Sequence, residues 1–194
     1  MAKKKPLEEA PSEWAQCATR FQESREATAQ ALAANGSGGP ADKAKHDILF
    51  YPGTGFDFLD PILLFAGHAG HFYYVDNDRE KCGLKGRLGE EAFRNALVQH
   101  GITLDEVKNK KYTKAGMDLH YREYALSYSG KEVLVRYYFN EYKDVLHYLA
   151  QKAMKISILV LRGYGGEGGS EFAGWASSNL KALKARLKAR FIEL

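Results

Sequence analysis

The chain has 194 residues, a formal net charge of +4 and a hydrophobic fraction of 45%, which suits one globular domain with an additional tail. No apolar run approaches the ~20 residues that a membrane-spanning helix needs, and the basic N-terminus lacks the apolar segment of a secretory signal. Cys17 and Cys82 are too few for a disulfide framework or a cysteine-based zinc site. We therefore expect a cytoplasmic protein without a membrane partner.

The N-terminal part is predicted to lie outside the folded domain. Residues 1–46 form a flexible leader with one helix, which begins near Ser12 and ends before the sequence Asn-Gly-Ser-Gly-Gly-Pro at 35–40. The domain itself is predicted to span residues 47–194.

Residues 47–76 predict a strand, a helix and a second strand. Residues 48–51 are apolar without alternation, which is typical of a strand covered on both faces in a parallel sheet. Asp60 and Pro61 form a predicted helix start, with Asp60 as the N-cap. The second strand covers residues 72–75.

The remaining elements follow in order. A helix is predicted at 90–100, a helical turn at 104–108, a basic loop at 108–114, strands at 119–128 and 132–139, a helix at 141–153, a strand at 156–161, a helix at 171–189 and a short strand at 191–194. Ser129 and Gly130 predict a hairpin between the two middle strands. This order indicates an α/β fold that is Rossmann-like, with a mostly parallel sheet, an antiparallel hairpin and helices on both faces.

A glycine turn and an acidic residue predict a ligand site. Gly53 and Gly55 follow the first strand, where glycine lets the backbone turn sharply and approach a ligand closely. Asp76 follows Gly53 by 23 residues, close to the ~20-residue spacing at which an acid binds ribose hydroxyls. Asp78 is an alternative to Asp76, and both also suit an ordinary turn.

Residues 48–76 resemble the first two motifs of class I S-adenosylmethionine-dependent methyltransferases, which are Rossmann-like enzymes. Gly53 and Gly55 match the Gly-x-Gly core of the family's cofactor loop, and Asp76 matches its ribose-binding acid. The family's acid at the end of the first strand has no counterpart, because Tyr51 and Pro52 occupy that region. The resemblance implies a pocket for S-adenosylmethionine.

A second glycine-rich segment, residues 162–170, follows the strand at 156–161. Its backbone amides and Arg162 suit an anion, but the Gly-Lys-Ser/Thr ending of a P-loop is missing. Glu167 is a candidate general base or a solvated loop acid, and the whole segment is equally well explained as a lid. The candidate cofactor-binding residues are Tyr51, Gly53, Thr54, Gly55, Asp76, Asp78, Arg162 and Gly163.

Basic residues provide a weaker alternative. A basic rim with interleaved tyrosines would suit a phosphate-bearing or nucleic-acid acceptor, although such clusters are more often solvated loops; it comprises Arg79, Lys81, Lys85, Arg87, Lys108, Lys110, Lys111 and Lys114, with Tyr112, Tyr121 and Tyr124. The six histidines show no metal-ligand spacing, so we expect no metal site.

Three functions remain open from the sequence. The first is an S-adenosylmethionine-dependent methyltransferase with an unknown acceptor and unidentified catalytic residues. The second is a non-catalytic protein that binds or sequesters a nucleotide-like small molecule on the same fold. The third is a nucleic-acid-associated protein.

Overall fold

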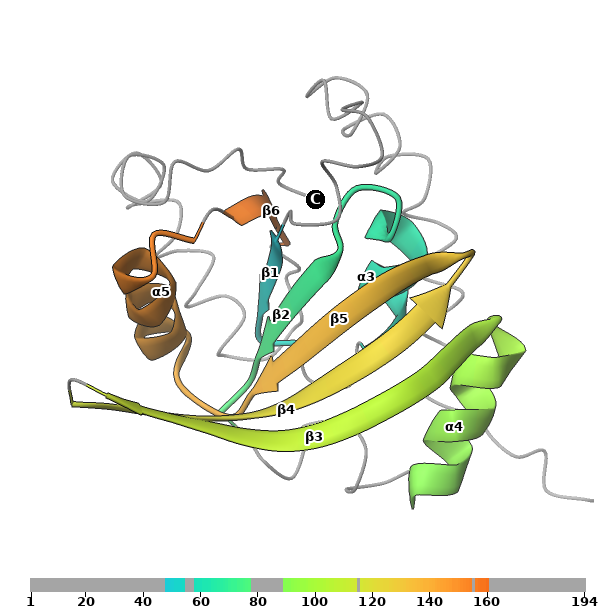
Figure 1. Ribbon diagram of the computed structural model, residues 1–194, viewed down its shortest axis with the longest axis horizontal. Coiled ribbons are helices and arrows are strands. Elements are labelled where there is room, and N and C mark those ends of the chain that lie inside the picture. Colours follow the sequence, from blue (N-terminus) through green and yellow to red (C-terminus); the bar gives the residue numbers. More distant parts are fainter. Residues whose placement is uncertain (1–47, 55–57, 78–88, 115, 155, 161–194) are drawn as a thin grey trace, which may run out of the picture.

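A computed structural model describes residues 48–54, 58–77, 89–114, 116–154 and 156–160. The elements in chain order are β1 (Ile48–Pro52), α3 (Leu59–Phe65), β2 (His71–Val75), α4 (Gly89–Gln99), β3 (Ile102–Lys114), β4 (Met117–Tyr128), β5 (Lys131–Tyr138), α5 (Tyr142–Gln151) and β6 (Ile156–Leu159) (Figure 1). The predicted leader at 1–46, the C-terminal helix at 171–189 and the strand at 191–194 lie outside the described residues.

The six strands form one mixed sheet in the order β3-β4-β5-β2-β1-β6. β1 pairs in parallel with β2 and with β6, and β2 pairs in parallel with β5. The three longest strands, β3, β4 and β5, instead form an antiparallel meander. The predicted Rossmann-like fold with a mostly parallel sheet is therefore wrong, and the described residues contain three helices.

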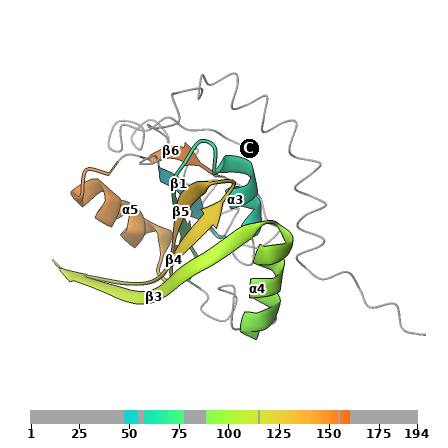
Figure 2. The ribbon, with the colours of Figure 1, turned by 45° about the vertical axis from the view of Figure 1, so that its right-hand side comes forward.

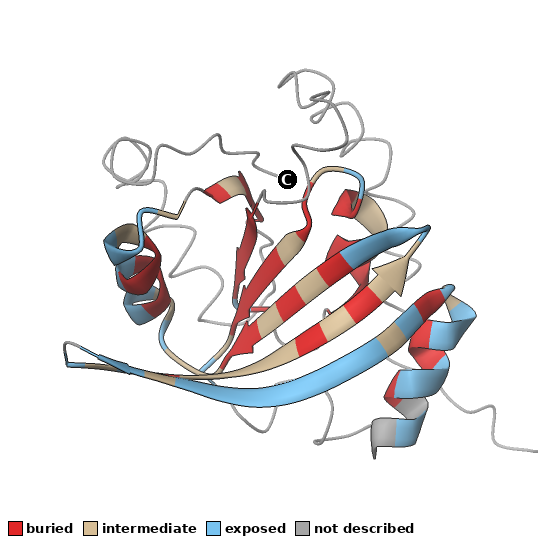
Figure 3. Ribbon diagram, viewed as in Figure 1, coloured by how far each residue is buried: buried red, intermediate tan, exposed pale blue. Residues whose placement is uncertain are grey.

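The error lies in the segment that was predicted as a helical turn and a basic loop. Residues 102–114 form β3, which pairs with β4 along its whole length. β3 lies at the edge of the sheet and is mostly exposed (Figure 3), so it needs few apolar side chains. Lysines are common on edge strands because their charge opposes pairing with another chain. The same lysines made this strand look like a loop in the sequence.

The predicted hairpin is confirmed as β4 and β5. Ser129 and Gly130 connect the strands with φ angles of 51° and 73°, as a type I′ hairpin turn requires at both central positions. Along β5, Val133, Val135 and Tyr137 are buried on one face, while Arg136 points to the other. Both faces of the sheet are thus specified by the alternation of side chains.

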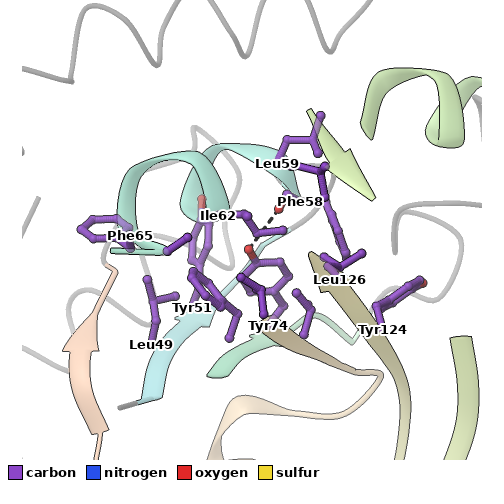
Figure 4. Close-up of a cluster of buried hydrophobic side chains, with 14 of the residues drawn as sticks. Leu49, Tyr51, Phe58, Leu59, Ile62, Phe65, Tyr74, Tyr124 and Leu126 are labelled. Atoms are coloured by element: carbon purple, nitrogen blue, oxygen red, sulfur yellow. Dashed lines mark hydrogen bonds between the residues drawn. The ribbon is translucent and has the colours of Figure 1, made fainter. Parts of the chain in front are cut away.

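One face is covered by α3 and α4, and the other by α5 (Figure 2). Ile62 and Phe65 of α3 join Leu49 and Tyr74 of the central strands in the first hydrophobic core (Figure 4). The Tyr74 hydroxyl donates a hydrogen bond to the Phe58 carbonyl at 3.0 Å, which ties β2 to the residue before α3.

The start of α3 differs from the prediction in one detail. The helix begins at Leu59, with Phe58 at the N-cap position and no side-chain cap. Asp60 is therefore not the N-cap but a buried residue in the first turn. A carboxylate there still interacts favourably with the positive end of the helix dipole, and Pro61 is tolerated because first-turn amides have no partner within the helix.

α5 packs on the opposite face. Val145 and Leu149 lie in a second hydrophobic core with Phe50 and Tyr138. The ends of β3 and β4 extend beyond β5 as a two-stranded arm (Figure 1). The Tyr112 ring of this arm packs edge-on against Tyr148 of α5, with 4.7 Å between the ring centroids.

Candidate functional site

The first glycine turn lies against the end of β2. The Gly53 amide donates a hydrogen bond to the Val75 carbonyl at 2.8 Å, and the Thr54 amide donates to the same oxygen at 3.3 Å. Gly53 has a φ of 66°, a left-handed conformation that glycine adopts without the steric cost of a side chain. The predicted turn and the predicted acidic position are therefore brought together, because Asp76 directly follows Val75.

Asp76 lies where three parallel strands end. Its side chain is half-buried, and its backbone amide donates to the Tyr138 carbonyl at 3.0 Å. The next residue, Asn77, donates from its side-chain amide to the Glu141 carboxylate at 2.7 Å. The Val160 amide donates to the Phe50 carbonyl at 3.0 Å, so the end of β6 lies at the same edge. We call this edge, with Gly53, Asp76 and Asn77, the carboxyl edge.

Two of the residues predicted to bind the ligand are buried and stabilise the turn. Tyr51 is fully buried and packs edge-on against Tyr74, with 6.1 Å between the ring centroids. Thr54 is also buried, and its hydroxyl donates to the Tyr51 carbonyl at 2.7 Å. The other four candidates, Gly55, Asp78, Arg162 and Gly163, lie outside the described residues, as does Glu167.

The hydrogen bonds of the turn limit the ligand chemistry of the carboxyl edge. The Gly53 and Thr54 amides already donate to Val75, so they do not form a cradle of amides for a phosphate. The Asp76 carboxylate has about four acceptor positions, enough to accept hydrogen bonds from a ligand in addition to those within the protein. This part of the edge therefore suits a ligand with hydroxyl groups better than one held by its phosphates.

The structure also shows a charged group that the sequence reasoning missed. Tyr73, Arg136 and Glu123 are direct neighbours across β2, β5 and β4. The Arg136 guanidinium donates from Nε to the Glu123 carboxylate at 2.8 Å and from Nη1 to the Tyr73 hydroxyl at 2.7 Å. Lys110 of β3 donates to the other Glu123 oxygen at 2.5 Å. We call these four residues the polar row.

Burial and pairing act together on the ionisation of the polar row. Burial raises the pKa of Tyr73 to about 12, against the opposing effect of Arg136. Burial also raises the pKa of Glu123, but the hydrogen bonds from Lys110 and Arg136 outweigh it and lower the pKa overall. Burial lowers the pKa of Arg136, whereas Tyr73 and Glu123 raise it above its usual value. At neutral pH the row therefore holds two cations, one carboxylate and one neutral phenol.

The predicted basic rim is largely neutralised where it is described. Three of its lysines pair with carboxylates of β3 and β4: Lys108 with Glu106 at 2.6 Å, Lys110 with Glu123 at 2.5 Å and Lys111 with Asp118 at 3.1 Å. The hydrogen bond from Lys111 lowers the pKa of Asp118. The rim residues Arg79, Lys81, Lys85 and Arg87 lie outside the described residues.

The tyrosines of the predicted rim do not share one surface. Tyr124 is buried against Phe58, with 5.0 Å between the ring centroids, whereas Tyr112 packs on α5 and Tyr121 lies beside Arg136 on the opposite face. A continuous row of stacking rings for single-stranded nucleic acid therefore does not form from these three residues.

Within the part of the chain that the structure describes, no three His, Cys, Asp or Glu side chains gather into a group that could hold a metal ion. No helix in the same part is long and apolar enough to cross a membrane. Comparisons of the chain with protein-family models, curated proteins and solved structures give no match.

Proposed function

We propose that the protein binds a nucleoside-containing small molecule at the carboxyl edge, with S-adenosylmethionine as the first candidate. The observation that supports this proposal is the pair of hydrogen bonds from Gly53 and Thr54 to the Val75 carbonyl. These bonds hold the glycine turn beside Asp76, as the sequence motif requires. In this proposal Gly53, which has no side chain, lets the ligand approach the turn closely, and Asp76 accepts hydrogen bonds from the ribose hydroxyls.

Methyl transfer is the reaction that such a ligand would support. It needs little acid–base chemistry when the acceptor is already nucleophilic, so holding the two reactants in line would supply much of the rate enhancement. The support is local to residues 48–76, since the sheet as a whole is mixed. We expect the protein to act in the cytoplasm, where its two cysteines would stay reduced.

Thermal unfolding in the presence of ligands tests the binding step. The panel comprises S-adenosylmethionine, S-adenosylhomocysteine, NAD, ATP and ADP-ribose. A ligand at 100 times its dissociation constant should stabilise the fold by about 2.7 kcal/mol. Asp76→Asn should weaken the binding of the two S-adenosyl compounds roughly 10- to 100-fold, because it removes hydrogen bonds to a charged acceptor.

Asp105→Asn is a matched control. Asp105 is an exposed strand carboxylate that accepts a hydrogen bond from the Ser127 hydroxyl at 2.7 Å, and its loss should leave ligand binding unchanged. If neither S-adenosyl compound raises the unfolding temperature, the choice of ligand is refuted. If the unfolding temperature of Asp76→Asn rises as much as that of the wild-type protein, the position of the site is refuted.

The alternative function is binding without turnover at the same edge. Incubation of the protein with S-adenosylmethionine and a panel of acceptors, followed by measurement of S-adenosylhomocysteine release, separates the two. Tight binding without release in every acceptor mixture would favour the non-catalytic protein.

A further inference from the structure

Four tyrosines lie close together near Arg136 on the face that α5 covers. They come from four elements, namely Tyr73 of β2, Tyr121 of β4, Tyr138 of β5 and Tyr148 of α5. The Tyr138 ring centroid lies 5.7 Å from that of Tyr73, 4.9 Å from that of Tyr121 and 6.5 Å from that of Tyr148. The Arg136 Cζ atom lies 5.3 Å from the Tyr73 centroid and 5.7 Å from the Tyr121 centroid. We call this group the tyrosine cluster.

Among the residues that the structure describes, none bonds to the Tyr138 hydroxyl, although Tyr138 is only 1% exposed. A buried hydroxyl without a partner destabilises the fold, so native proteins rarely keep one unless something else bonds to it. Burial raises the pKa of Tyr138, and the nearby hydroxyls of Tyr73, Tyr148 and Tyr121 raise it further. The hydroxyl therefore keeps its proton and is available as a donor.

Other donors in the cluster also have spare capacity. A guanidinium has five N–H groups, and the described contacts of Arg136 use one toward Glu123 and one toward Tyr73. Since the Tyr73 hydroxyl accepts its bond from Arg136, its own proton remains to be donated. Donors with unused protons thus lie on the neighbouring strands β2 and β5. Glu123, which is the neighbouring acceptor, is already bonded by Lys110 and Arg136.

The charge and exposure of the polar row, which shares Tyr73 and Arg136 with this site, favour an anion. Lys110 and Arg136 carry two positive charges against the single negative charge of Glu123, which leaves a net charge of +1. The Lys110 and Arg136 side chains are 39% and 20% exposed, whereas Glu123 is 11% exposed. The positive side chains therefore face the solvent more than the carboxylate does.

We propose that the tyrosine cluster binds a tetrahedral oxyanion, either inorganic phosphate or the phosphate group of a monoester. Arg136 and the hydroxyls of Tyr73 and Tyr138 donate to its oxygens, and it enters from the side of Lys110. Phosphate suits this site because guanidinium groups and hydroxyls are its usual donors in proteins. The proposal is independent of the carboxyl edge, where the ligand is held through its hydroxyls.

Tyr138→Phe tests the proposal because it removes only the hydroxyl. In phosphate-free buffer the variant should unfold at the same urea concentration as the wild-type protein or a higher one, since no bond is lost. Isothermal titration with inorganic phosphate at constant ionic strength should give a dissociation constant at least about tenfold higher for the variant. Tyr128→Phe is the control, a half-buried strand tyrosine packed on the opposite core, and it should titrate like the wild-type protein.

Two further experiments identify the ligand and separate the two sites. Titration with glycerol 1-phosphate, with glycerol as its control, shows whether a monoester binds more tightly than free phosphate. Asp76→Asn should leave phosphate binding unchanged, which separates this site from the carboxyl edge.

Two results would overturn the proposal. The first is the absence of heat on titration of the wild-type protein with both phosphate compounds. The second is a lower urea midpoint for Tyr138→Phe in phosphate-free buffer, which would show that a buried water molecule already bonds to the hydroxyl.

Discussion

Removal of the Glu123 charge should destabilise the protein more than removal of any other carboxylate on β3 or β4. Glu123 accepts hydrogen bonds from Arg136 at 2.8 Å and Lys110 at 2.5 Å, and its side chain is 11% exposed. In Glu123→Gln, the largely buried Arg136 keeps only uncharged acceptors, the Tyr73 hydroxyl and the glutamine carbonyl. Breaking a fully buried ion pair costs about 3–5 kcal/mol.

The expected cost of Glu123→Gln is smaller than that, at about 2–3 kcal/mol, because the glutamine carbonyl still accepts one bond and Arg136 reaches water. Lys110→Met should cost only about 0.5–1 kcal/mol, since Lys110 is 39% exposed and Arg136 still pairs with Glu123. Glu106→Gln is the matched control. Glu106 pairs with Lys108 at 2.6 Å but is 53% exposed, so its loss should cost about 0–1 kcal/mol.

Equilibrium unfolding in urea measures these costs, and a double-mutant cycle with Arg136→Met isolates the coupling. The double variant should be at least about 1 kcal/mol more stable than the sum of the single effects predicts, because removal of both partners leaves no unpaired buried charge. A cost of Glu123→Gln no larger than that of Glu106→Gln, or a coupling below about 0.5 kcal/mol, would show that Glu123 does not stabilise the buried Arg136 charge.

Two other predictions concern pH and the glycine turn. Because the pKa of Glu123 is lowered in the folded state, its contribution to stability is present above the unfolded-state pKa of about 4.3 and is lost as the pH falls through the folded-state pKa. Urea midpoints measured across this range should therefore fall more steeply for the wild-type protein than for Glu123→Gln, and parallel curves would contradict the assignment. Gly53→Ala should lower stability by about 1–2 kcal/mol because φ is 66° at this position, whereas Gly67→Ala should be tolerated, since its added Cβ meets only the Lys131 Nζ atom at 3.8 Å. Thermal unfolding of both variants measures the difference, and equal losses would show that the turn conformation is not the cause.

The elements with strong local signals were predictable from the sequence. The first two strands, the hairpin at Ser129-Gly130 and the helices now labelled α4 and α5 are confirmed with ends shifted by one or two residues. β3 was not predictable in this way, because an edge strand is stabilised by pairing with β4 and not by an apolar pattern of its own. Once residues 102–114 are a strand, the predicted hairpin becomes a three-stranded antiparallel meander.

The carboxyl edge was predictable in outline, because a glycine turn after one strand and an acid after the next must meet if the strands are parallel neighbours. The roles of Tyr51 and Thr54 inside the turn depend on packing that sequence spacing does not encode. The polar row was missed for a similar reason. Its one visible signal is that Glu123 and Arg136 occupy inward-facing positions of two strands joined by a tight turn, which places opposite charges across from each other.

The arrangement of the sheet also bears on the order in which it forms. The β3–β4–β5 meander joins neighbouring segments through short turns, whereas β1 must find β6 across more than half the chain. Closure of a long loop costs conformational entropy before any contact compensates for it. We therefore expect the meander to form early and the pairing of β1 with β6 to form late. The carboxyl edge would then be among the last parts to assemble, so a ligand that binds there would recognise only the completely folded chain.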